Sequence, residues 1–275
     1  MTTLSALAAF FVSSLVHTLT PAGMVAQVDT VGLAGPFAMS LSQTSAATLD
    51  VGWSHNAAKA FIRPDNIVLW ALLIAVWGGL SIYAGSLVMR ARMVPHRLDG
   101  SLQKAPWARP PAAKPEDLRP VELAPIAAAL IAAALWPWVS MSQPLAGFVL
   151  TTAMMLAALT AVIRGQREGQ RLRYHRSFAI FAGWATAVTY ASFASLLTTD
   201  LGVTPGLAAV IAMVLCAGVG IIVQAQLGRA TSFSIALIWA LVGLSISAMA
   251  SDPMVANAAV LGITAMIVML VRAAS

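Results

Sequence analysis

The chain has very little charge for its length. Charged residues make up 9% of its 275 residues and hydrophobic residues 59%, whereas a soluble domain carries about a quarter charged residues. The mean hydropathy is +0.83. These values exclude a soluble domain, and with it a soluble enzyme domain, and they are typical of a multi-pass membrane protein.

Cysteine is almost absent too. The one cysteine, Cys216, falls inside an apolar run, which excludes an intrachain disulfide and any cysteine-based metal motif. Of the four histidines, His17 and His175 lie at the ends of predicted helices and the other two in predicted loops. Because no pair of histidines is placed to bind a haem from within a bundle, a haem-ligating bundle is disfavoured, and we predict no metal site.

Ionisable side chains are missing from the centres of the apolar runs. None of these runs has a Lys or Arg in its central turns, and the two acids within them, Asp65 and Glu122, lie at their ends. Proton and ion pathways need ionisable groups at bilayer depth, so charge-coupled transport is disfavoured. No nucleophile–base pair or metal-ligand cluster appears in the spans or in the loops, and we therefore predict that the protein is not an enzyme.

Apolar runs of membrane-spanning length dominate what is present. A hydrocarbon core of ~30 Å needs ~20 residues per helix, and eight segments are predicted to meet this requirement: 4–19, 65–88, 122–140, 145–163, 177–197, 205–225, 231–249 and 254–272. Proline is favoured at the first position of a helix, and it precedes or opens four of these segments, at Pro64, Pro144, Pro205 and Pro253. Thr204 and Asp252 are predicted N-caps. The fold class is thus an all-α, polytopic transmembrane bundle of about eight helices.

Fourteen of the sixteen positive charges lie in alternate gaps between these segments. Seven lie from Arg90 to Arg119, five from Arg164 to Arg176, and one each at Arg229 and Arg272, while gaps 141–144, 198–204 and 250–253 have none. Short loops rich in Lys and Arg stay in the cytoplasm, so we predict that both termini are cytoplasmic. The net charge of +6 is thus explained by loops that flank a membrane, and nucleic acid is not expected as a partner.

The organisation predicted from these patterns has four parts. They are a first transmembrane helix with an outer loop (1–64), a second helix (65–89), a cytoplasmic loop rich in Pro and Arg (90–121) and a six-helix bundle (122–275). Segment 4–19 has the length of a signal-peptide core, but no Lys or Arg precedes it, so we interpret it as a helix. Cleavage of that segment stays open as the alternative.

Tryptophan is abundant, with eight residues in the chain. Trp70, Trp136 and Trp138 are predicted near the outer interface, where aromatic belts are usual. The other group is predicted at least seven residues inside its helices, too deep for a belt: Trp77, Trp184 and Trp239. Such residues either pack the bundle or line a pocket, and the sequence leaves both interpretations open.

Several of these tryptophans occur in segments that resemble a known family. RSFAIFAGWATAVTYASFASLL (176–197) carries Gly-Trp-x-Thr, and SFSIALIWALVGLS (232–245) carries Trp-Ala-x-x-Gly. FIRPDNIVLWALLIAVWGGLSIYAG (61–85) has a helix led by proline with Trp and Tyr, and WPWVSMSQPLAGFVL (136–150) is rich in aromatic residues. In pattern and order they resemble the longer bacterial branch of the TspO/MBR family, the tryptophan-rich sensory proteins related to animal translocator protein.

The resemblance implies a receptor or regulator in the bacterial cytoplasmic (inner) membrane, often dimeric, that binds a porphyrin or another hydrophobic molecule. We predict a flat apolar ligand, such as a tetrapyrrole, held by some of these aromatic side chains: Trp77, Trp136, Trp138, Trp184, Tyr190 and Trp239. Aromatic stacking and apolar burial would hold it. Two alternatives remain, namely a structural or assembly subunit of a larger membrane complex and, less favoured, a transporter of a neutral or lipid-like solute.

Overall fold

The fold is entirely helical in the part of the chain that the structure describes. The computed structural model describes residues 2–19, 58, 60–64, 66–92, 120–140, 143–167, 173–228, 231–248 and 253–274. They contain the helices α1 (Thr2–Leu19), α4 (Ile67–Arg92), α5 (Pro120–Ser140), α6 (Pro144–Arg167), α7 (Arg173–Thr199), α8 (Pro205–Leu227), α9 (Ser232–Ala248) and α10 (Pro253–Ala274), with no strand among the described residues. The predicted all-α class is confirmed.

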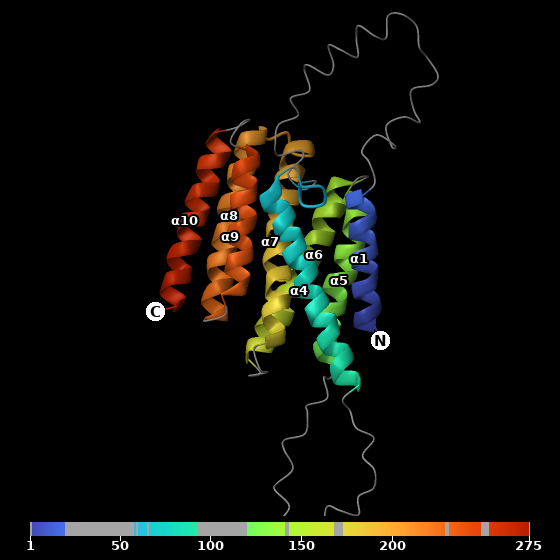
Figure 1. The fold of residues 1–275 in the computed structure, drawn as a ribbon. Helices are drawn as coiled ribbons and strands as arrows, with labels where there is room; N and C mark the ends of the chain where they lie inside the picture. Colours follow the sequence, from blue (N-terminus) through green and yellow to red (C-terminus); the bar gives the residue numbers. More distant parts are fainter. Residues whose placement is uncertain are drawn as a thin grey trace, which may run out of the picture.

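The helices run side by side with α7 at the centre (Figure 1). α7 packs against α4, α6, α8 and α9, while α1 packs against α5 and α4, and α10 against α8 and α9. In the membrane-spanning part of α7, 78% of the residues are buried, compared with 33% in α10. α7 is therefore shielded by protein on most sides, and α10 keeps a wide apolar face outside the bundle, as expected for a helix that faces lipid.

Seven of the eight described helices are long and apolar enough to cross a membrane. The exception is α9, whose 17 residues extend about 26 Å at 1.5 Å per residue, somewhat less than the predicted span 231–249. α9 is packed by four other helices, α4, α7, α8 and α10. α1 begins and α10 ends at the same end of the bundle (Figure 1). This is expected when an even number of helices run alternately in opposite directions.

Proline opens the helices where the sequence predicts it, with one exception. α6, α8 and α10 begin at Pro144, Pro205 and Pro253. Thr204 is at the N-cap position of α8 but its side chain makes no capping hydrogen bond, and Asp252 lies outside the described residues.

The prediction that Pro64 marks the start of the second span is wrong, because α4 begins later in the chain, at Ile67. The cap is Asn66, whose Oδ1 accepts a hydrogen bond from the N–H of Leu69 at 2.9 Å. Asn66 Nδ2 donates to the carbonyl of Gly243 at 2.9 Å and to Ser247 Oγ at 2.7 Å. One amide side chain therefore starts α4 and ties it to α9, which explains why the helix begins here and not at the proline.

Glycine permits the closest helix contacts. A Cβ on Gly183 of α7 would lie 2.6 Å from the carbonyl oxygen of Phe233 and 2.9 Å from Cβ of Ala236, both on α9. A Cβ on Gly243 of α9 would lie 2.5 Å from Cδ2 of Leu69 on α4. α9 thus meets α7 and α4 through glycines, as small-residue packing in membranes allows.

Two predicted regions lie largely outside the described residues, namely the outer loop 20–63 and the cytoplasmic loop 90–120. The four-part division of the chain and the cytoplasmic location of both termini stay predictions.

Candidate functional site

Six aromatic rings from four helices meet inside the bundle, beside α7. Along one line, Tyr83 of α4 meets Phe178 at a centroid distance of 5.9 Å, Phe178 meets Phe181 at 5.2 Å, and Phe181 meets Trp184 at 5.7 Å. Trp184 then meets Trp136 of α5 at 6.3 Å, edge to face. We call this set, completed by Phe10 of α1, the aromatic cluster: Phe10, Tyr83, Trp136, Phe178, Phe181 and Trp184.

The rings of the cluster are buried and pack against one another. Phe10 meets both Phe181 (5.9 Å) and Trp184 (6.1 Å) at steep interplanar angles, and no member of the cluster is more than 5% exposed. Phe178, Phe181 and Trp184 are three residues apart, which places them on one side of α7. Edge-to-face pairs add about 0.5–1.5 kcal/mol each beyond the burial of their area, so the cluster is both a core and a set of flat aromatic surfaces.

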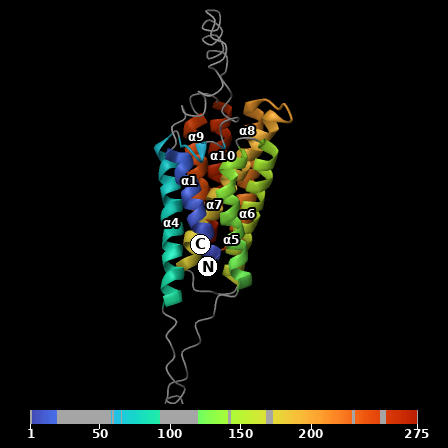
Figure 2. The ribbon, with the colours of Figure 1, turned by 90° about the vertical axis from the view of Figure 1, so that its right-hand side faces the viewer.

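Two further tryptophans hold α1 from opposite sides. Trp77 Nε1 of α4 donates to Ser14 Oγ at 3.2 Å, and Trp138 Nε1 of α5 donates to Ser13 Oγ at 3.0 Å. Ser13 Oγ in turn donates to the carbonyl of Ala134 at 2.6 Å. Figure 2 shows α1 between α4 and α5, so these bonds fix α1 as the outer wall of the cluster.

The C-terminal end of α1 makes further polar contacts. The ring of His17 meets that of Trp138 at 4.5 Å, edge to face, and Nδ1 of His17 lies 3.1 Å from the carbonyl of Ser13, so this nitrogen is the donor. Arg63 Nε donates to the carbonyl of His17 at 2.8 Å. Thr18 Oγ1 reaches the carbonyl of Ile62 at 3.3 Å. The short segment before α4 is thereby joined to the end of α1.

The six residues predicted to hold a ligand are thus divided among three places. Trp136 and Trp184 belong to the aromatic cluster, and Trp77 and Trp138 bind the serines of α1. Tyr190 of α7 and Trp239 of α9 are partly buried and pack against the core, but neither makes a ring contact with the cluster in the described part of the chain. The assignment of all six to one ligand site stays a prediction.

The contribution of α1 to the site was not predicted from the sequence. Its buried side chains include Thr3, Ala6, Phe10, Ser13 and His17, whose alternate spacings of three and four residues place them on one helical face. That spacing was the available signal. It indicates a helix that packs along the bundle, and two of its polar members, Ser13 and His17, are where hydrogen bonds form.

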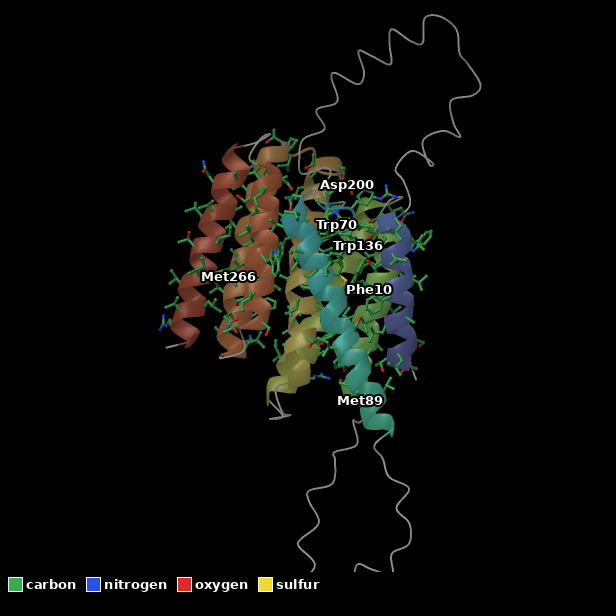
Figure 3. The ribbon with its side chains drawn as sticks, viewed as in Figure 1. Phe10, Trp70, Met89, Trp136, Asp200 and Met266 are labelled. Atoms are coloured by element: carbon green, nitrogen blue, oxygen red, sulfur yellow. The ribbon has the colours of Figure 1, made fainter. Side chains whose placement is uncertain are left out.

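Among the residues that the structure describes, two buried polar atoms have no hydrogen-bond partner, Nε1 of Trp136 and Oγ of Ser192. Trp136 is 1% exposed and lies on α5 (Figure 3). Such atoms are rare in folded proteins, where roughly 90% or more of buried polar groups are paired. Among the described residues there is also no group of three His, Cys, Asp or Glu side chains that could hold a metal ion.

A comparison with family models gives one match, described as TSPO-like protein, over residues 54–272. It includes seven of the eight described helices and leaves out α1. Comparisons with curated proteins and with solved structures give no match.

Proposed function

Because the chain belongs to the TSPO-like family and is a multi-pass membrane protein, we propose that it is a non-enzymatic receptor or regulator that binds a tetrapyrrole or another flat hydrophobic ligand inside its bundle. The observation that carries this proposal is the aromatic cluster, in which four helices bring six buried rings together around Trp184. Flat aromatic surfaces away from charge suit a flat, largely apolar molecule.

Burial of the cluster supports a regulatory role. Because its rings are at most 5% exposed, a ligand reaches them only when a neighbouring helix moves. A ligand that binds the opened arrangement more tightly shifts the population toward it. Occupancy of the site is therefore coupled to the packing of the helices, and this coupling is what a sensor requires.

The proposed location is the bacterial cytoplasmic membrane, with both termini in the cytoplasm. The alternation of the positive charges supports this orientation.

Titration of the purified full-length protein with protoporphyrin IX, followed by quenching of tryptophan fluorescence, tests the proposal. We expect saturable quenching. We expect the conservative variant Trp184→Phe to weaken binding by roughly 5- to 15-fold, because the smaller phenyl ring loses part of the stacking area of the indole, an effect of about 1–1.5 kcal/mol. Trp70→Phe is the matched control, because Trp70 lies outside the aromatic cluster on α4 (Figure 3). Quenching that does not saturate, or that is the same in Trp184→Phe as in the unchanged protein, contradicts the proposal.

A further inference from the structure

The indole N–H of Trp136 is a strong donor left without an acceptor. Trp136 is 1% exposed and its Nε1 has no hydrogen-bond partner, while the indoles of Trp77 and Trp138 each donate to a serine. Leaving a buried donor unpaired costs about 1–3 kcal/mol. The chain thus supplies acceptors for two neighbouring tryptophans and none for the third.

The surroundings of Trp136 do not remove this cost. Its ring meets Trp184 edge to face at 6.3 Å, and an N–H edge over an aromatic face is only a weak interaction. A bound water needs two to four polar partners, and the ring of Trp184 offers none. Within the described residues, the N–H of Trp136 therefore has no acceptor that the protein itself supplies.

Ser192, the other unpaired group, differs in one respect. A serine hydroxyl in a helix can rotate toward the carbonyl four residues earlier in its own helix, here that of Val188. The indole of Trp136 is fixed by its ring contacts and has no such choice. Trp136 is consequently the more informative of the two unpaired groups.

We propose that Trp136 Nε1 donates a hydrogen bond to the bound ligand, so that the site selects flat apolar molecules that carry a carbonyl or carboxylate oxygen. This inference rests on the proposed function and specifies its ligand class. An indole N–H is a donor only, so the matching group on the ligand is an acceptor. Ligand sites typically combine an apolar lining with a few placed polar groups, and Trp136 beside Trp184 has this composition.

Three porphyrins of the same ring size separate the contributions. Protoporphyrin IX carries two carboxylates, its dimethyl ester carries carbonyl oxygens without charge, and etioporphyrin carries only alkyl groups. We expect the full-length protein to bind the first two more tightly than the third. The variant Trp136→Phe keeps an aromatic ring and loses the N–H, so it should weaken binding of the first two by roughly 5- to 10-fold and change that of etioporphyrin much less.

Two further variants test whether the loss is due to the N–H of Trp136. Trp70→Phe serves again as the control, because Trp70 lies on α4 outside the aromatic cluster (Figure 3), and it should show no selective loss for the two porphyrins with acceptors. Replacement of Trp136 by 3-benzothienylalanine, which has sulfur in place of N–H at nearly the same size, should repeat the selective loss without a cavity. This variant also covers the case in which Trp136→Phe does not fold.

The outcomes distinguish the two proposals. If all three porphyrins bind with equal affinity, or if both Trp136 variants weaken all three equally, the hydrogen bond is refuted while the binding function stands. If none of the porphyrins binds saturably, the proposed function fails, and this inference fails with it.

Discussion

At the scale of single residues, the Ser13 hydroxyl joins α1 to α5 through two hydrogen bonds. It donates to the carbonyl of Ala134 and accepts from the indole of Trp138. Pro137 of α5 lacks the N–H that would bond the carbonyl of Ala133, four residues earlier, so the helical ladder is interrupted directly beside Ala134. A side chain of α1 therefore strengthens α5 at a point where α5 is weakened.

Ser13→Ala removes both bonds and leaves the indole N–H of Trp138 without its partner. We expect a loss of about 1–2 kcal/mol in the free energy of unfolding, because hydrogen bonds between membrane helices are worth about 0.6–1.7 kcal/mol and an unpaired donor adds to the cost. Ser5→Ala is the matched control, since Ser5 is exposed and bonds only within its own turn. Unfolding in SDS titrations measures both, and equal midpoints for the two variants would contradict the assigned role of Ser13.

Single residues also mark the limit of prediction from the sequence. The abundance and depth of the tryptophans indicated that they matter, and Trp136 and Trp184 do lie together. Which indoles are paired could not be predicted, because each acceptor comes from a residue distant along the chain, such as Ser14 for Trp77.

At the scale of helices, the contact of α7 with α9 depends on one missing methyl group. Gly183→Ala would place Cβ 2.6 Å from the backbone oxygen of Phe233, and a backbone atom cannot rotate away. We expect a destabilisation of about 1–3 kcal/mol, typical of overpacking. The thermal midpoint in detergent measures it.

Gly218→Ala in α8 is the control for this substitution, because a Cβ there meets nothing within 4 Å. It should be neutral or slightly stabilising, since alanine favours a helix more than glycine does. A Gly183→Ala protein as stable as Gly218→Ala would show that α7 and α9 are farther apart than described here.

Helix positions were largely predictable because hydrophobic length and proline are local signals. α6, α8 and α10 begin within one residue of the predicted spans. The start of α4 was predicted from Pro64, yet it depends on Asn66, whose amide binds Gly243 and Ser247 of α9. Contacts of this kind join residues 177 and 181 positions apart, and no local pattern contains them.

At the scale of the whole molecule, the charge pattern predicts which end of the bundle faces the cytoplasm. Asp200 and Met89 lie at opposite ends (Figure 3) and both are exposed. Cys216 is buried, so Cys216→Ala gives a background without cysteine. In that background we expect Asp200→Cys to react with a membrane-impermeant maleimide in spheroplasts, and Met89→Cys to react only after lysis.

The reverse labelling pattern would invert the orientation, and labelling of both positions before lysis would contradict a membrane-spanning bundle. The all-helical class, and seven helices long and apolar enough to cross a membrane, followed from composition and length. The aromatic cluster could not be predicted in this way, because it forms only when α1, α4, α5 and α7 pack together. The sequence of a single segment does not determine which helices become neighbours in space.

The bond from Ser13 to Ala134 also has a consequence for biosynthesis. The two residues are 121 positions apart, so at ~5–20 residues per second the ribosome needs about 6–24 s to make the second after the first. The partners of Phe10 are made later still, since Phe181 and Trp184 are on α7. α1 is therefore made before the helices that complete its contacts, since Trp77 of α4, Ala134 of α5 and Trp184 of α7 all follow it in the chain. The packing of α1 into the bundle is therefore completed only after α7 has been made.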